Sequence, residues 1–542
     1  MINMTLGQYL DHIASKYPDQ DALVVSGKLR YSYKTLKNIA NRLAKGLLKI
    51  GLKKGDHVAI WASNVPEWII TLFATAKIGC PLVPVNTEYK DSEVEYILKQ
   101  SDSKAIILID GYKKLNYVKT IYDLMPNLKR SQKDNFHSEK FPNLNYIINI
   151  GKNIYPGMYN FDEILEIGNM QDDNIVYEIQ NSLKPDEVID IQYTSGTTGF
   201  PKGAMLTHYG LLNNGDAIAT RMKFTTNDKL CITVPLFHCF GYTLSVMACL
   251  SKGTTMVLVD HFNPLTVMEV LDKEKCTAVH GVPTMFITML NHQDFNKFDF
   301  SNMRTGIMAG SVCPIKVMKA VVEKMNMREI TSVYGLTEAS PGITQTSVDD
   351  SLEDRVSTVG YVFPEIEMKV VDPKTGDELP IGVEGEIIAR GYNIMKGYYK
   401  MKEETEKVIE PDGWLHTGDI GKIDERGYLR ITGRLKDMII RGGENISPTE
   451  IEECLYHHPG VKDVQIIGVP DEKYGEEIMA YVIPKEGYHL AEDDIIEYAK
   501  QKLARFKIPK YVKIISEFPT TTSGKVQKYR LREMAISELN FS

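Results

Sequence analysis

The chain has 542 residues, of which 43% are hydrophobic and 25% charged, and a formal net charge of −8. Its length suggests roughly three or four units, or one large domain with a satellite, and the lack of a dense basic stripe argues against nucleic acid as a partner. No apolar leader and no window of about 18 uncharged apolar residues are evident, so we expect a cytoplasmic protein without a transmembrane segment.

The first 185 residues begin with the alternating pattern of an α/β unit. The spacing of apolar residues predicts a helix over Tyr33–Ile50, a strand over His57–Trp61, a helix over Glu67–Ile78 and a strand over Pro81–Pro84. Residues 110–185 carry little periodicity, and we expect loops there.

The stretch Tyr193–Ala204 consists mostly of small, hydroxylated and cationic residues. We expect a strand over Glu187–Tyr193 before it and a helix over Leu206–Asn214 after it. Glycines let main-chain N–H groups approach an anion, hydroxyls donate hydrogen bonds, and a lysine adds positive charge. The spacing departs from that of the Walker loop, yet the composition predicts a polyphosphate site. The residues expected to form it are Thr194, Ser195, Gly196, Thr197, Thr198, Gly199 and Lys202.

The α/β pattern returns after the glycine stretch. Alternating strands and helices imply parallel sheets with helices on both faces, and ligands bind beyond the carboxyl ends of such strands. The expected strands are Lys229–Pro235, Thr254–Val259, Thr277–Gly281, Thr305–Met308 and Glu329–Tyr334, and the expected helices are Gly241–Ser251, Pro264–Lys273 and Pro314–Met325.

The texture changes from about Val359, where short strands with turn signals predict a small antiparallel or barrel-like unit. Beyond Gly433 the pattern predicts a compact α+β tail. We therefore expect an α/β fold with a large N-terminal domain over residues 1–434 and a small mobile C-terminal domain over 435–542. The large domain should comprise subdomains at about 1–185, 186–355 and 356–434.

Four more clusters share the polar, glycine-containing character of the stretch at 193–204. They are Tyr334–Glu338, Gly413–Asp419, Gly433–Asp437 and Ser523–Lys525. Five such clusters in this order resemble the adenylate-forming superfamily, which includes acyl- and aryl-CoA synthetases, luciferases and the adenylation domains of peptide synthetases. The resemblance runs from about residue 5 to 535.

Within that superfamily the chain is most similar to fatty-acyl-CoA ligases of the medium-chain type. The segments that carry this likeness are Pro235–His238, Met438–Asn445 and Arg505–Lys510. The resemblance implies that a carboxylate attacks the α-phosphorus of ATP, expels pyrophosphate and forms an acyl-adenylate, from which the thiol of coenzyme A displaces AMP. Dimers are common among relatives, so a homodimer is possible.

The resemblance also assigns roles around ATP. Lys525 would bridge the attacking carboxylate and the α-phosphate, while Thr194, Lys202 and the rest of the glycine loop cover the outer phosphates. Glu338 would help to hold Mg²⁺, and Thr337 would contact the phosphates.

The nucleoside would be held by a second group. Asp419 and Arg434 would bind the ribose hydroxyls. The expected adenine contacts are Tyr334, Gly335 and the small loop at Gly310 and Ser311.

The tail domain would serve both half-reactions. Lys525 is expected to act in adenylation, and the loop at Gly442 and Gly443 to line the pantetheine tunnel during transfer to coenzyme A. One domain cannot present both faces at once, so the tail should rotate about a hinge at Lys436.

The acid is expected to bind near His238. Residues 231–251 contain no charged side chain, which disfavours an amino-acid substrate because a buried ammonium would lack a partner. A medium-chain fatty acid is the first choice and an aromatic acid the second; loading of a carrier protein and a regulatory nucleotide-binding protein remain as alternatives. The expected pocket residues are His238, Phe240, Gly241, Gly310 and Gly335, with the glycines leaving room for the chain.

Overall fold

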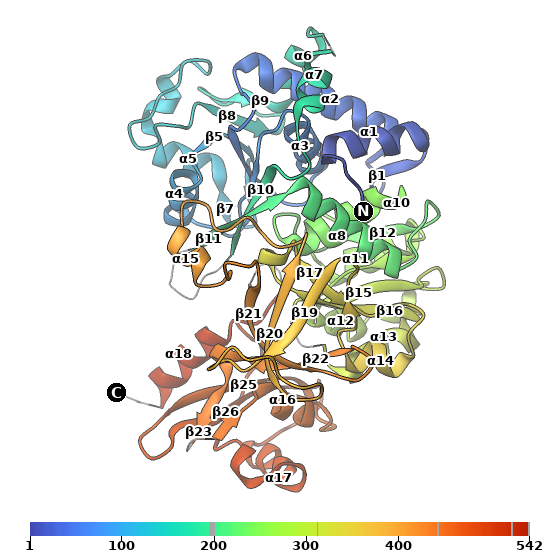
Figure 1. The fold of residues 1–542 in the computed structure, drawn as a ribbon, viewed down its shortest axis with the longest axis vertical. Helices are drawn as coiled ribbons and strands as arrows, with labels where there is room; N and C mark the ends of the chain where they lie inside the picture. The colour runs from blue at the N-terminus through green and yellow to red at the C-terminus, as the bar shows by residue number, and fades with distance from the viewer. Residues whose placement is uncertain (173, 195–200, 312, 442–443, 522–523, 540–542) are drawn as a thin grey trace.

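The computed structural model describes residues 1–172, 174–194, 201–311, 313–441, 444–521 and 524–539. The chain forms two large sheets, then a smaller antiparallel sheet, and then a C-terminal α+β unit. These parts follow one another along the long axis of the molecule, from the blue N-terminal elements to the red C-terminal ones (Figure 1). The expected α/β fold with a smaller C-terminal domain is confirmed.

The first large sheet has seven strands in the order β11-β10-β4-β3-β5-β8-β9. Its strands run parallel except for β11, which pairs antiparallel with β10 at one edge. The strands are β3 (His57–Trp61), β4 (Leu82–Pro84), β5 (Ser103–Ile109), β8 (Tyr146–Ile150), β9 (Tyr159–Asn160), β10 (Val188–Thr194) and β11 (Lys202–Thr207), and a separate hairpin is formed by β6 (Gly111–Tyr112) and β7 (Leu115–Asn116).

The second large sheet has nine strands in the order β18-β17-β16-β15-β14-β12-β13-β1-β2. The strands from β16 to β1 are parallel, and antiparallel strands close both edges. The strands are β1 (Asp21–Val25), β2 (Leu29–Ser32), β12 (Lys229–Ile232), β13 (Thr255–Leu258), β14 (Ala278–Val279), β15 (Thr305–Ala309), β16 (Glu329–Gly335), β17 (Gly342–Gln345) and β18 (Tyr361–Val362).

The two large sheets do not divide the chain at residue 186 as the predicted subdomains do. Strand β1 pairs with β13 in the second sheet, and β10 pairs with β4 in the first. Each pairing joins strands from opposite sides of the predicted boundary. Hydrogen bonding and packing with neighbouring strands decide which sheet a buried strand joins, and its position in the chain does not.

Helices cover both large sheets, and local signals account for their ends. Helix α2 follows an N-cap at Ser32, whose side chain accepts a hydrogen bond from the Thr35 N–H, and it stops at Gly51 in the left-handed region. The helices of this part are α1 (Leu6–Lys16), α2 (Tyr33–Ile50), α3 (Pro66–Lys77), α4 (Asp91–Gln100), α5 (Tyr117–Leu124), α6 (Phe161–Asn169), α7 (Asn174–Ser182), α8 (His208–Arg221), α9 (Cys239–Gly241), α10 (Ala248–Lys252), α11 (Pro264–Lys273), α12 (Pro283–Leu290), α13 (Ile315–Lys324), α14 (Leu352–Ser357) and α15 (Lys402–Glu406).

The expectation of loops over residues 110–185 is wrong. This stretch contributes β8 and β9 to the first sheet and carries helices α5, α6 and α7. Asn116 and Asn160 cap α5 and α6, so the asparagines that suggested loops instead begin helices.

The rest of the chain forms two smaller sheets, as the change of texture indicates. The antiparallel sheet contains β19 (Ile366–Val371), β20 (Gly385–Gly391), β21 (Leu415–Ile423) and β22 (Leu429–Arg434). The C-terminal unit contains β23 (Ile439–Arg441), β24 (Glu444–Ile446), β25 (Val461–Asp471), β26 (Gly475–Pro484), β27 (Tyr511–Ile514), α16 (Pro448–Tyr456), α17 (Glu492–Lys502) and α18 (Lys528–Glu538). Among the described residues, no helix has the length and apolarity needed to cross a membrane.

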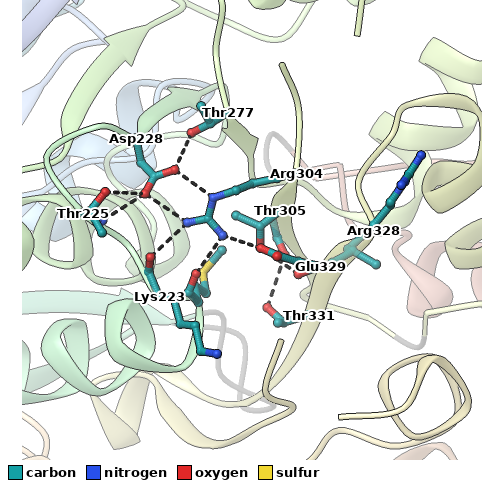
Figure 2. A network of polar contacts seen from close by, with 12 residues as sticks. Lys223, Thr225, Asp228, Thr277, Arg304, Thr305, Arg328, Glu329 and Thr331 are labelled. Carbon is teal, nitrogen blue, oxygen red and sulfur yellow. Dashed lines mark hydrogen bonds and ion pairs between the residues drawn. The ribbon is translucent and has the colours of Figure 1, made fainter. Parts of the chain in front are cut away.

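A polar network links the amino ends of β12, β14, β15 and β16 in the second large sheet (Figure 2). The Arg304 guanidinium donates two hydrogen bonds to Asp228, at 2.9 and 3.0 Å, and also pairs with Glu329. Asp228 further accepts from the Thr277 hydroxyl at 2.8 Å and the Thr225 N–H at 2.9 Å. Burial alone would raise the pKa of Asp228, but the bonds from Arg304 and the other donors lower it below its usual value.

Asp228→Asn should destabilise the large domain by about 1.5 to 3 kcal/mol, since one partner of a half-buried charged pair is lost. Thermal unfolding measures this loss. A depressed carboxyl pKa contributes stability above its unfolded value of about 3.9, so the gap to the wild type should narrow as the pH falls through the folded pKa. Asp349→Asn is the matched control, because it removes an exposed ion pair with Lys223 and should cost little. Equal effects of the two variants would contradict the stabilising role of the network.

Candidate functional site

The predicted glycine loop joins β10 to β11. Thr194 pairs with Lys202 at the end of this antiparallel hairpin that adjoins the loop. The loop therefore connects two strands, and the expected strand-to-helix connection is wrong, because Lys202–Thr207 forms β11 before α8 begins. Ser195, Gly196, Thr197, Thr198 and Gly199 lie outside the described residues, so the structure places only the two ends of the loop.

Lys202 is held by residues that the sequence analysis does not identify. Its Nζ contacts Glu404 Oε2 at 2.6 Å and lies 4.9 Å from the centre of the Tyr398 ring. The main chain of residues 395–399 contacts β11, where the N–H of Tyr399 donates to Gly203 O at 2.8 Å. Residues 391–399 contain two glycines and three tyrosines. The glycines are the sequence signal that could have indicated a close approach of another backbone segment.

The three residues expected around the ribose and adenine come together from three strands. Asp419 on β21 is 5% exposed and forms an ion pair with the Nε of Arg434 on β22. The hydroxyl of Tyr334, at the end of β16, donates to Asp419 Oδ2 at 2.9 Å. This buried carboxylate is thus fixed between a cation and a phenol, at the junction of the second large sheet and the small antiparallel sheet.

A charged histidine supports the backbone that carries Asp419. His416 contacts Glu386 at 2.9 Å through Nδ1 and Glu410 at 2.8 Å through Nε2, and these two carboxylates raise its pKa to about 9. Glu386 also accepts from the Gly418 N–H at 3.1 Å. An imidazolium that donates from both nitrogens therefore holds Glu386 in place beside the Asp419 turn.

Glu338 and Thr337 lie in a single 3₁₀ turn just after β16. The Tyr398 hydroxyl donates to Glu338 Oε1 at 2.7 Å, and the Thr337 hydroxyl lies 3.5 Å from Cys239 Sγ. In the part of the chain that the structure describes, no group of three or more His, Cys, Asp or Glu side chains could hold a metal. Glu338 therefore belongs to no such cluster among the described residues.

Lys525 lies on a tight turn of the tail domain that reaches the large domain. Gly524, its neighbour, accepts a hydrogen bond from Thr284 of α12 at 3.0 Å. Desolvation, followed by repulsion from Arg434, lowers the pKa of Lys525 to about 8, and the charge of Asp419 acts in the opposite direction. The side chain keeps contact with solvent. The structure thus brings the predicted catalytic lysine into the electrostatic field of the ribose residues.

His238 lies at the start of α9 and is half buried. Burial and then the charge of Lys525 lower its pKa to about 4, so the imidazole is neutral. Its Nδ1 accepts the Phe240 N–H at 3.1 Å, which leaves the ring proton on Nε2. His238 therefore presents one N–H donor.

The predicted pocket glycines serve different purposes. A Cβ at Gly241 would lie 2.2 Å from the Pro235 carbonyl oxygen, and one at Gly335 would lie 1.8 Å from the Pro341 carbonyl oxygen. The chain's own backbone thus fills the space that was expected to receive an acyl chain, and tight main-chain packing explains these two glycines. Gly310 differs, because it is exposed with φ +87° and directly follows β15, with exposed Ser311 next in the chain.

His280 is a buried polar residue that the sequence analysis misses. The Ser245 hydroxyl donates to Phe240 O at 3.0 Å, so its oxygen accepts from His280 Nδ1 at 3.2 Å. Nε2 is then a bare acceptor, and no partner for it exists among the described residues. The centre of its ring lies 6.0 Å from that of Phe240 and 6.3 Å from that of Phe224. Only its position after β14, beside the apolar α9 region, could have indicated that this histidine is buried.

The last two predicted features lie on the tail side. Lys436 is exposed in a short 3₁₀ turn between β22 and β23, which is the connection between the two smaller sheets. This is a suitable place for a hinge. Gly442 and Gly443 lie outside the described residues.

The chain matches known protein families along most of its length. The sequence profile of the family described as AMP-binding enzyme matches residues 10–399, and that of its C-terminal domain matches residues 450–525. The chain is 51% identical to Bacillus subtilis (strain 168) YngI, named as an acyl-CoA synthetase, over 100% of this chain and 99% of that protein. It is 38% identical to the mitochondrial medium-chain acyl-CoA ligase ACSF2 of Rattus norvegicus, over 98% of this chain and 88% of that protein.

A solved structure extends the likeness to the whole fold. ATP-bound MatB from Rhodopseudomonas palustris superposes with a TM-score of 0.82 at 28% identity, covering 98% of this chain and 99% of that chain. The apo structure of the same protein gives a TM-score of 0.74 over the same shares. The present structure thus superposes better on the ATP-bound form of this relative than on its apo form.

Proposed function

The chain belongs to the AMP-binding enzyme family and is an AMP-forming acid–thiol ligase of the acyl-CoA synthetase class, and on that premise we propose that it activates a medium-chain fatty acid. ATP and coenzyme A are its co-substrates. The observation that carries the proposal is the convergence of Tyr334, Asp419 and Arg434 beside the turn of Lys525. This group offers a ribose acceptor, a ribose donor and a catalytic cation in one place.

In the proposed first step, the carboxylate of the acid attacks the α-phosphorus of ATP and pyrophosphate leaves. Two anions must approach each other, so the barrier falls only if fixed cations cover the charge as it moves. Lys525 bridges the carboxylate and the α-phosphate, and Thr194 and Lys202 cover the leaving pyrophosphate. The Nε2–H of neutral His238 donates a hydrogen bond to the carboxylate of the acid and keeps its proton.

Lys202 reaches the phosphates from a paired state. Its ammonium is paired with Glu404 at 2.6 Å, and Lys202 as a whole is only 9% exposed. A triphosphate carries more negative charge than one carboxylate, so it competes for this ammonium when ATP enters. Glu404 thereby keeps the lysine in position without ATP.

The donor set at Glu338 fits a magnesium ion. Mg²⁺ is usually bound by one or two carboxylates together with substrate phosphates and water, and not by a cage of protein ligands. Glu338, with the Thr337 hydroxyl beside it, supplies such a lone hard-oxygen site. We propose that these residues hold Mg²⁺, which would neutralise phosphate charge when bound.

The second half-reaction requires another arrangement of the tail. After adenylation the tail rotates about Lys436, Lys525 leaves the site, and the loop at Gly442 and Gly443 lines the path of the pantetheine arm. The thiol of coenzyme A then displaces AMP from the acyl-adenylate and forms the thioester. Because each arrangement of the tail serves only one half-reaction, the two reactions stay separate.

The preference for a medium-chain acid rests on the apolar surroundings of His280. The rings of Phe240 and Phe224 lie near a neutral imidazole whose pKa burial lowers to about 3, and no charged side chain occurs in residues 231–251. Such surroundings favour an alkyl chain over an acid with an ammonium group. The name of the rat relative, a medium-chain acyl-CoA ligase, supports the same choice.

A panel of acids tests this proposal. Pyrophosphate release is measured with straight-chain, branched and aromatic acids, each with and without coenzyme A. We expect the highest kcat/KM with a straight medium-chain acid and a thioester product when coenzyme A is present. A higher kcat/KM with benzoate would favour an aryl-CoA ligase, release without a thioester product would favour a carrier-protein thiol, and no release with any acid would contradict the enzyme.

A further inference from the structure

The first turn of α12 meets the turn that carries Lys525. Thr284 Oγ1 donates to the carbonyl oxygen of Gly524 at 3.0 Å. Thr284 belongs to the large domain and Gly524 to the tail domain, so this hydrogen bond joins the two parts directly beside the catalytic lysine. Val282, just before α12, lines the same contact, since a Cβ at Gly524 would lie 2.9 Å from its Cγ2.

On the tail side, three hydrogen bonds link Thr521 to Gly524 and Lys525. The Thr521 N–H donates to Lys525 O at 2.7 Å, and the Gly524 N–H donates to Thr521 O at 2.8 Å. The Lys525 N–H donates to Thr521 Oγ1 at 3.1 Å. Gly524 has φ +81°, a conformation that favours glycine. Because the backbone of Lys525 is fixed to this turn, whatever holds the Gly524 carbonyl also holds the base of the lysine side chain.

Among the described residues, the hydrogen bond of the Thr284 hydroxyl goes to an acceptor outside its own helix. Helix α12 begins at Pro283, and its N-cap residue Val282 makes no side-chain cap bond. Thr288, one turn later, shows the alternative, because its hydroxyl donates to the Thr284 carbonyl oxygen at 2.7 Å within the helix. Thr284 instead uses its hydroxyl across the domain boundary.

We propose that Thr284 is a positioning residue that fastens the tail domain in the arrangement for adenylation. The inference rests on the proposed function, because it acts through Lys525. A contact that exists in only one of two arrangements stabilises that arrangement by its own free energy. When the tail rotates about Lys436, the contact breaks, so its free energy favours the adenylation arrangement over the other one. Thr284 thus contributes to the adenylation step alone.

The two half-reactions are measured separately in four proteins. Acid-dependent exchange of pyrophosphate into ATP reports adenylation, and thioester formation from supplied octanoyl-AMP and coenzyme A reports transfer. The proteins are the wild type, Thr284→Val, Thr284→Ser and Thr288→Val. Valine keeps the shape of threonine without the hydroxyl, serine restores the hydroxyl, and Thr288→Val removes a hydroxyl that stays within the helix.

Thr284→Val should slow exchange by about three- to tenfold, which corresponds to one hydrogen bond, and should leave transfer unchanged or faster. Thr284→Ser should regain exchange to within about twofold of the wild type, and Thr288→Val should match the wild type in both reactions. Retained transfer shows that Thr284→Val is folded.

Two results would overturn the inference: normal exchange in Thr284→Val, or an equal loss of exchange and transfer. Failure of serine to restore exchange would also count against it, because the hydroxyl would then not be the active group. If the wild type itself shows no exchange, the proposed function fails instead, so the two failures are distinguishable.

Discussion

Lys525→Ala should slow acyl-adenylate formation by at least about 10²- to 10³-fold, which is the loss expected when one charge partner of a transition state is removed. Transfer of the acyl group from supplied acyl-adenylate to coenzyme A should remain close to that of the wild type. The reason is that, in the proposed mechanism, Lys525 acts only in the arrangement in which its turn contacts α12. Single-turnover assays of each half-reaction measure this split.

The pH dependence should follow the same lysine. Its pKa is lowered to about 8, chiefly by desolvation and then by Arg434. The protonated form supplies the charge, so kcat/KM for ATP should be highest below pH 8 and should fall as the pH rises through that value.

Lys500→Ala is the control for Lys525→Ala, because Lys500 is an exposed lysine of α17 paired with Glu497. An equal loss of both half-reactions in Lys525→Ala would contradict the assignment.

Asp419→Ala should lower kcat/KM for ATP by at least about 100-fold. The change removes a carboxylate that would accept bonds from the ribose hydroxyls, and each hydrogen bond to a charged group is worth about 1.5 to 3 kcal/mol. It also leaves Arg434 without its partner and the Tyr334 hydroxyl without its acceptor. Initial rates over a range of ATP concentrations measure the effect.

Asp419→Asn separates charge from shape at the same position. The amide keeps an acceptor for Tyr334 but loses the ion pair with Arg434. Its kcat/KM for ATP should therefore lie between those of the wild type and Asp419→Ala. If both variants kept the wild-type KM for ATP, Asp419 would not bind the nucleotide.

Features with local signals could be predicted from the sequence almost completely. Helix α2 begins and ends at the expected residues, because a serine cap and a glycine stop lie next to it. The same holds for Tyr334, Asp419 and Arg434, which occur in recognisable clusters and come together in the structure.

Features that depend on distant pairing could not be predicted. Strand β11 is defined by its register with β10, and nothing within Lys202–Thr207 distinguishes it from the start of the next helix. Tyr398 and Glu404 contact Glu338 and Lys202 from a segment that lies far along the chain. Single-sequence patterns report local propensity and burial, and such contacts follow only from the packing of whole sheets.

The acyl-adenylate is the central claim, and isotope transfer tests it most directly. Octanoate labelled with ¹⁸O in both carboxyl oxygens is converted with ATP and coenzyme A, and the AMP product is examined by mass spectrometry. Attack of the carboxylate on the α-phosphorus leaves one carboxyl oxygen on that phosphorus, so the account predicts one ¹⁸O atom in each AMP. Formation of the thioester with unlabelled AMP would contradict it.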